Sequence, residues 1–88
     1  MHPSKKDFRA IIIIMLRTAQ SYNKTYLDIN AASLHRFVGG YPNQNHRMPS
    51  CNDAMRSLLN DNDQILKVPK KLYGASLTIR YHLPRRIP

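Results

Sequence analysis

A segment near the C-terminus restricts the fold of this chain more than any other. In residues 75–83 every second side chain is apolar: Leu77, Ile79, Tyr81 and Leu83. Strict alternation is the pattern of a β-strand with one buried face. Residues 64–68, QILKV, predict a partner strand, and the connection at 69–74 is too long for a two-residue turn. We therefore expect a β-hairpin with a basic loop that carries Lys70, Lys71 and Tyr73.

Two helices are expected at the start of the chain. Residues 4–22 begin with the capping pattern Ser-x-x-Asp and continue with apolar residues at helical spacing. A shorter helix, residues 31–38, follows the capping residue Asn30 and stops at a Gly-Gly pair. Between the two helices, residues 25–29 alternate weakly and predict a short strand or an extended segment.

Residues 49–60, PSCNDAMRSLLN, predict a third helix that again begins with a Ser-x-x-Asp capping pattern. Its apolar face consists of Cys51, Ala54, Met55, Leu58 and Leu59. The opposite face is polar, and Asn52, Arg56 and Asn60 are of the types that hydrogen-bond base edges in a major groove. An ordinary solvated helix face has a similar composition, so the helix alone does not decide a function.

Four consecutive isoleucines in the first helix exceed what one helix face can bury in a small core. Either the C-terminal strands wrap this helix, or a second copy of the chain forms a homodimer with it through Ile11, Ile12, Ile13 and Ile14. With 88 residues, the chain is expected to form one domain, 1–88, that ends in a basic tail at 84–88. The apolar run at 10–16 is too short for a membrane span or a signal peptide, so no membrane association is expected.

The charge of the chain is large and unevenly distributed. It has 14 Lys and Arg against 5 Asp and Glu, a net charge of +9. Such a charge favours a polyanion, nucleic acid before an anionic membrane surface. Residues 1–24 and 67–88 hold the positive charge, whereas residues 25–66 are nearly neutral. The hairpin and tail would then contact phosphates while the third helix reads bases.

Side chains suited to catalysis or metal binding are scattered. The single cysteine and the four histidines form no Cys-x-x-Cys or His-x-x-x-His pair, so no metal site is expected. Cys51 lies on an apolar helix face, which favours a buried thiol over a nucleophile assisted by His46. No Gly-rich phosphate loop is present, and we expect neither an enzyme nor a cofactor. One cysteine suits the reducing cytoplasm.

The order of elements, with the basic hairpin at the end, resembles the winged helix-turn-helix superfamily over nearly the whole chain. The segments GGYPNQNHRMP and GASLTIRYHLP are also similar to parts of small uncharacterised bacterial proteins. The superfamily resemblance implies an α+β domain in which the third helix docks on duplex DNA and the hairpin is the wing, a non-catalytic regulator or accessory factor. The loop at 39–48 is longer than a strict helix-turn-helix turn.

We expect the nucleic-acid contacts to come from the third helix, its preceding loop, the wing and the tail. These residues are Arg47, Asn52, Arg56, Asn60, Lys70, Lys71, Tyr73, Arg80, Arg85 and Arg86. His46 would join Arg47 on phosphates. Two other functions fit the same pattern. The basic surface could bind an acidic protein partner, or Tyr41 and Tyr73 could stack on the bases of RNA.

Overall fold

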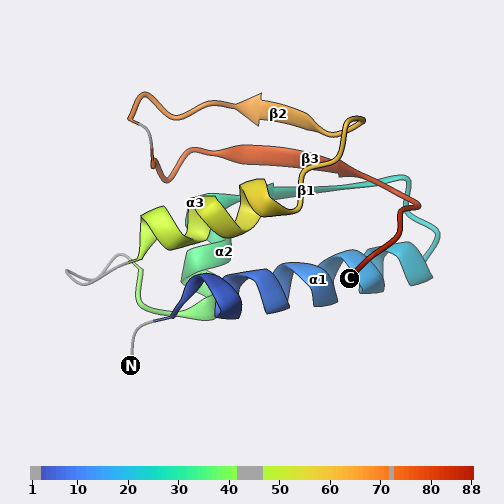
Figure 1. The fold of residues 1–88 in the computed structure, drawn as a ribbon, viewed down its shortest axis with the longest axis horizontal. Helices are drawn as coiled ribbons and strands as arrows, with labels where there is room; N and C mark the ends of the chain where they lie inside the picture. Colours follow the sequence, from blue (N-terminus) through green and yellow to red (C-terminus); the bar gives the residue numbers. More distant parts are fainter. Residues whose placement is uncertain (1–2, 42–46, 72) are drawn as a thin grey trace.

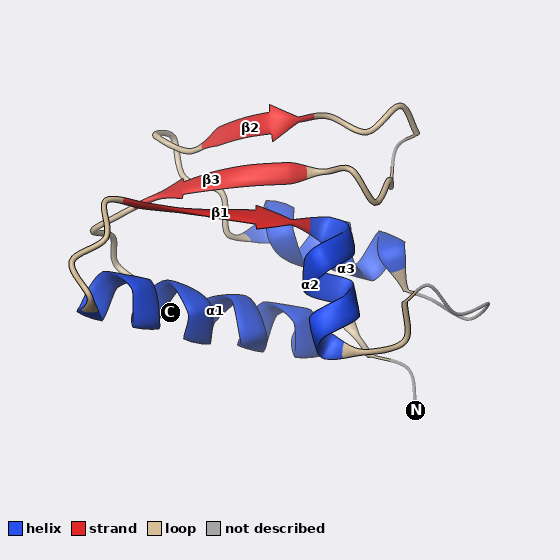
Figure 2. Cartoon of the chain, turned by 180° about the vertical axis from the view of Figure 1, so that it is seen from behind, coloured by secondary structure: helices blue, strands red, loops and turns tan. Residues whose placement is uncertain are grey.

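A computed structural model describes residues 3–41, 47–71 and 73–88. Within these residues the chain forms α1 (Lys5–Ser21), β1 (Tyr26–Asn30), α2 (Ala31–Val38), α3 (Met48–Ser57), β2 (Gln64–Lys67) and β3 (Thr78–His82). The strands make one antiparallel sheet in the order β1-β3-β2. The helices lie on one side of the sheet (Figure 1, Figure 2). An α+β fold with three helices and a C-terminal β-hairpin is therefore confirmed for this part of the chain.

The sheet has a buried face and an outer face. In the central strand β3, Ile79 lies opposite Ile29 of β1 and Ile65 of β2. The alternating residues are buried as predicted: Leu77, Ile79, Tyr81 and Leu83. The outer face, turned away from the helices, is formed by Tyr26, Asp28, Thr78, Arg80 and His82. Both hairpin strands are somewhat shorter than the sequence suggested.

Helix α1 begins with the predicted capping box. The Asp7 N–H donates to Ser4 Oγ (3.3 Å), and the Ser4 N–H donates to Asp7 Oδ2 (2.8 Å). Three side chains at helical spacing are buried: Phe8, Ile12 and Leu16. Tyr22, the last residue of the predicted helix, is 73% exposed, because α1 ends at Ser21 and Tyr22 lies in the turn that follows.

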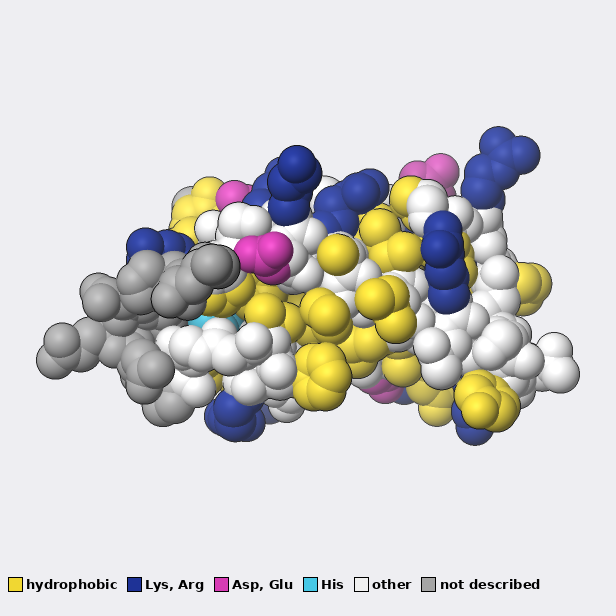
Figure 3. Space-filling view, turned by 90° about the horizontal axis from the view of Figure 1, so that it is seen from below, with side chains coloured by type: hydrophobic (Ala, Val, Ile, Leu, Met, Phe, Trp, Pro, Cys, Tyr) yellow, Lys and Arg dark blue, Asp and Glu magenta, His cyan; other side chains and the backbone are white. Residues whose placement is uncertain are grey.

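The four isoleucines of α1 are divided between the core and the surface. Ile12 is wholly buried, Ile11 and Ile13 are half-buried, and Ile14 is 58% exposed. Figure 3 shows hydrophobic side chains gathered along the middle of the molecular face over α1.

The C-terminal tail lies along another side of α1, as the red segment of Figure 1 shows. Among the described residues, no helix combines the length and apolar character that crossing a bilayer requires.

Helix α2 begins and ends as the sequence predicted. The Asn30 side chain caps it by accepting from the Ser33 N–H (3.1 Å), and it also donates to Thr78 Oγ1 (3.0 Å). Gly39, at a φ of 118°, ends the helix in a conformation that favours glycine. Asn30 thus joins the start of α2 to the end of β1 and to the neighbouring strand β3.

The start of α3 differs from the prediction. The helix begins at Met48, and its N-cap residue, Arg47, makes no side-chain capping bond. Capping by Ser50 was therefore wrong: Pro49, whose fixed φ suits the first helical turn, already lies inside the helix. The helix ends at Ser57, so Asn60 lies beyond it.

Candidate nucleic-acid interface

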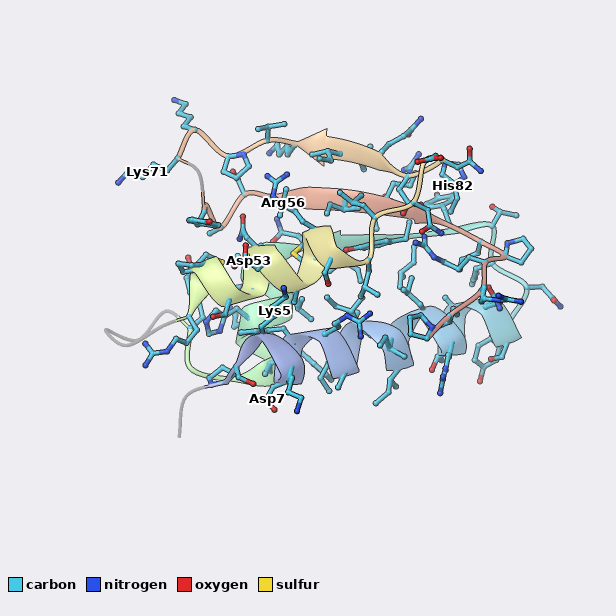
Figure 4. All side chains as sticks on the ribbon, in the orientation of Figure 1. Lys5, Asp7, Asp53, Arg56, Lys71 and His82 are labelled. Carbon is cyan, nitrogen blue, oxygen red and sulfur yellow. The ribbon has the colours of Figure 1, made fainter. Side chains whose placement is uncertain are left out.

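The side of α3 that faces away from the core is polar and partly exposed. Asp53 and Arg56 are half-exposed and Ser57 is exposed, at positions that share one side of a helix. Figure 4 shows Asp53 and Arg56 on α3 and Lys5 on the adjoining part of α1. Asn60 is exposed in the turn after α3. The predicted base-reading face is therefore reduced to Arg56 within the helix and Asn60 beyond its end.

Asn52, predicted to read bases, is wholly buried instead. Its Nδ2 donates to the carbonyl of Met48 in its own helix and to the carbonyl of Gly74 in the hairpin loop, both at 3.2 Å. Asn52 lies one turn after the buried Met48 and one turn before the buried Met55, so it shares their side of the helix. Asn52 therefore fixes the loop beside α3, and its buried side chain cannot contact a ligand.

The base of the hairpin loop is closely packed. A Cβ atom added at Gly74 would lie 2.3 Å from Cβ of Pro69, which is itself buried. Lys70, Lys71 and Tyr73 beyond this contact are exposed, as the sequence predicted for a solvated loop. In Figure 4, Lys71 stands at the tip of the hairpin. The loop thus presents two cations from an anchored base next to α3.

Two arginines that were predicted to contact phosphate, Arg80 and Arg85, form ion pairs within the protein instead. Arg80 makes a bidentate pair with Asp28 (Nε to Oδ1, 2.8 Å) and lies 4.1 Å above the ring of Tyr26. This pair lowers the pKa of Asp28 below its ordinary value, mainly through the hydrogen bond from Arg80. Because Arg80 belongs to the outer face of the sheet, opposite the helices, it is excluded from an interface built on α3.

Arg85 is held inside the molecule. Its guanidinium donates to both carboxylate oxygens of Asp63 (2.9 and 3.0 Å) and to the carbonyl of Leu58, while its N–H donates to Gln20 Oε1 (2.7 Å). The Arg85 and Asp63 side chains are only 6% and 0% exposed. A role for Arg85 on phosphates is therefore wrong, whereas the neighbouring Arg86 is exposed as predicted.

Two cations of α1 add to the positive charge near α3. Lys5 and Arg9 are four residues apart, which puts them on one side of the helix. Arg9 lines a pocket with Ser57 and Asn60, so that part of α1 meets the end of α3. From the sequence, these cations were expected to add to the charge of residues 1–24 but not to lie at the interface. The sequence signal that could have indicated this is the separation of Lys5 and Arg9 by four residues in a helix with a predicted N-cap, which puts both on one side.

The segment before α3 is positioned by a buried histidine. The Arg47 N–H donates to Nε2 of His35 (2.8 Å), and the Arg47 side chain is exposed.

Tyr41 is half-buried, with its ring centroid 5.5 Å from that of His35 and 5.7 Å from the guanidinium carbon of Arg36. Tyr73 is 42% exposed. His46, predicted to contact phosphate, lies outside the described residues.

Cys51 is a buried structural thiol, as predicted. Its side chain is wholly buried, and burial raises its pKa to about 12. The thiol therefore stays protonated at neutral pH and is a poor nucleophile. Within residues 3–41, 47–71 and 73–88, no group of three or more His, Cys, Asp or Glu could hold a metal ion.

No protein-family model, curated protein or solved structure matches this chain. The candidate interface is consequently defined by geometry and charge: the polar side of α3, with Lys5 and Arg9 beside it, the loop cations Lys70 and Lys71, and Arg86 of the tail.

Proposed function

We propose that this protein binds duplex DNA through α3 and the hairpin loop, as a cytoplasmic, non-catalytic regulator or accessory factor of the winged helix-turn-helix type. One observation carries the proposal: the anchored hairpin loop presents Lys70 and Lys71 beside the polar side of α3. The order of elements, which is the order predicted from that superfamily, also supports it. A cytoplasmic location is suggested by the single cysteine, which suits a reducing compartment.

The proposed interface divides its tasks between phosphates and bases. Lys70, Lys71, Lys5 and Arg9 would contact phosphates on either side of α3, which sets orientation without sequence preference. Arg56 would enter the major groove, where a guanidinium makes bidentate hydrogen bonds to guanine. Asp53 beside it keeps α3 itself nearly neutral, so the non-specific part of the affinity would come from the flanking cations.

The experiment that tests this proposal removes the loop cations. Lys70→Gln with Lys71→Gln should weaken binding to a random-sequence duplex in fluorescence anisotropy. It should also reduce the slope of log affinity against log salt by about 0.9 for each lost phosphate contact. Both side chains lie in an exposed loop, so the thermal unfolding transition should not change.

A charge-matched control separates a contact from a general effect of net charge. Lys24→Gln with Lys67→Gln removes the same charge from exposed positions, one after α1 and one in β2 opposite Thr78 of the outer face. This control should retain the wild-type salt slope. An equal loss of affinity in both double variants would contradict a contact by the loop.

We also propose that a second copy of the chain covers the exposed face of α1. Ile14 is 58% and Phe37 75% exposed, and Phe37 lines a depression together with Met15 of α1. Isolated apolar residues are common on protein surfaces, but Ile14 lies one helical turn from the half-buried Ile11 of α1. Ile12, which is wholly buried, no longer belongs to this interface.

A further inference from the structure

A small pocket lies where the C-terminal tail crosses between α1 and the end of α3. It has a volume of about 120 Å³, and three arginines line it: Arg9, Arg85 and Arg86. Ser57 and Asn60 contribute polar groups, and the lining includes no Asp or Glu side chain. Pro88 also lines the pocket, and its main-chain oxygen accepts a hydrogen bond from Arg17. Residues from three distant parts of the sequence thus form one cationic pocket.

The three arginines have different roles in this pocket. Arg85 is already satisfied by Asp63 and by the Leu58 carbonyl. Its bond to Leu58 occupies a carbonyl at the C-terminal end of α3, where exposed carbonyls would otherwise repel an anion. Within the described residues, the guanidinium groups of Arg9 and Arg86 have no hydrogen bond or ion pair, and both side chains reach solvent. Arg9 and Arg86 are therefore the groups available to a ligand.

The size of the pocket restricts the ligand. At about 120 Å³ it exceeds the space of a single water molecule but falls well short of the roughly 300–1,000 Å³ of pockets that enclose drug-sized ligands. A tetrahedral oxyanion fits this range, whereas a whole nucleoside does not. Guanidinium groups bind such an anion through paired, charge-assisted hydrogen bonds.

We infer that this pocket binds a phosphate group, held by Arg9 and Arg86 with the side-chain amide of Asn60 as a further donor. The Ser57 hydroxyl already donates to the Ala54 carbonyl (2.7 Å), so it adds polarity without a free proton. The inference does not depend on duplex binding. The phosphate is either that of a small phosphorylated compound or one from a nucleic-acid backbone that lies along α3.

The pocket is tested with inorganic phosphate and the intact chain. In ¹H–¹⁵N NMR at constant ionic strength, phosphate in place of chloride should cause saturable shifts at Asn60 and Ser57. Arg9→Gln and Arg86→Gln should each lower the affinity for phosphate by about tenfold or more. Lys67→Gln, on the outer face of the sheet, should leave it unchanged, and circular dichroism shows whether each variant is folded.

Two results would overturn the inference. One is the absence of saturable phosphate shifts in the wild type beyond those of chloride. The other is an equal loss in Lys67→Gln and in the two arginine variants, which would indicate attraction by net charge alone.

A competition experiment identifies the source of the phosphate. If a backbone phosphate occupies the pocket, saturating inorganic phosphate displaces duplex DNA at constant ionic strength. If the occupant is a small phosphorylated compound, saturating inorganic phosphate leaves the duplex affinity unchanged. Either result supports the pocket. Loss of duplex binding in the loop variants does not bear on it, so the two proposals fail separately.

Discussion

The Asn52 side chain helps to fix the position of the hairpin loop. It is wholly buried, and its amide joins α3 to Gly74. Asn52 Oδ1 has no hydrogen-bond partner among the described residues. The two hydrogen bonds of Nδ2 offset part of the cost of burying the amide. At the scale of single residues, the buried amide of Asn52 therefore fixes the hairpin loop to α3.

We predict that Asn52→Ala lowers the free energy of unfolding by about 1–3 kcal/mol, because two buried hydrogen bonds are lost. Chemical denaturation measures this change. Asn62→Ala, at an exposed position in the turn before β2, is the control and should stay within about 0.5 kcal/mol of the wild type. Unchanged stability together with weakened DNA binding would instead restore Asn52 as a base-reading residue.

At the scale of elements, a buried ion pair helps to attach the tail to the rest of the fold. Arg85 connects the tail to Asp63, which precedes β2, and to the carbonyl of Leu58, which directly follows α3. Asp63 also accepts from the backbone N–H groups of Asn60 and His82, at 2.8 Å each. This carboxylate therefore organises the turn before the hairpin as well as the tail.

Asp63→Asn should be strongly destabilising. It leaves the Arg85 guanidinium buried without its counter-charge, and breaking such a pair costs about 3–5 kcal/mol. Asp61→Asn removes the same charge from an exposed position of the same turn and serves as the control. If thermal unfolding shows equal small losses in both variants, the ion pair does not attach the tail.

The elements were predictable to the extent that their signals are local. Ser4 and Asp7 lie three residues apart, and the alternation at 77–83 is continuous, so the α1 cap and the hairpin followed from the sequence. The environments of Asn52 and Arg85 did not, because their partners Gly74 and Asp63 are each 22 residues away in the chain. The start of α3 was misplaced because a cap-like Ser-x-x-Asp pattern lies inside the helix.

At the scale of the whole molecule, the surface has chemically different sides. On one side, Arg9 of α1 adjoins the polar residues Ser57 and Asn60 at the end of α3. Apolar side chains lie over another face of α1 (Figure 3), and the outer face of the sheet holds the paired Arg80 and Asp28. A homodimer through α1 would leave the α3 side of both copies open. It would then present two α3 helices to a duplex, which is the arrangement expected for a two-fold site.

We predict that the wild type sediments as a dimer at micromolar concentration and that Ile14→Glu is a folded monomer with weaker duplex binding. The folded state should persist because Ile14 is already 58% exposed. Lys67→Glu, on the outer face, should remain dimeric. A monomeric wild type would exclude the dimer and leave the apolar face of α1 without this role.

The most direct test of duplex binding by α3 and the hairpin loop is to map the contact on the protein. In a ¹H–¹⁵N NMR titration with a random-sequence duplex, we expect the largest shifts at Arg56, Ser57 and Lys71. Shifts should be small at Asp28 and His82, because both lie on the outer face of the sheet. Saturable shifts concentrated on that outer face, or none at all, would contradict the proposed interface.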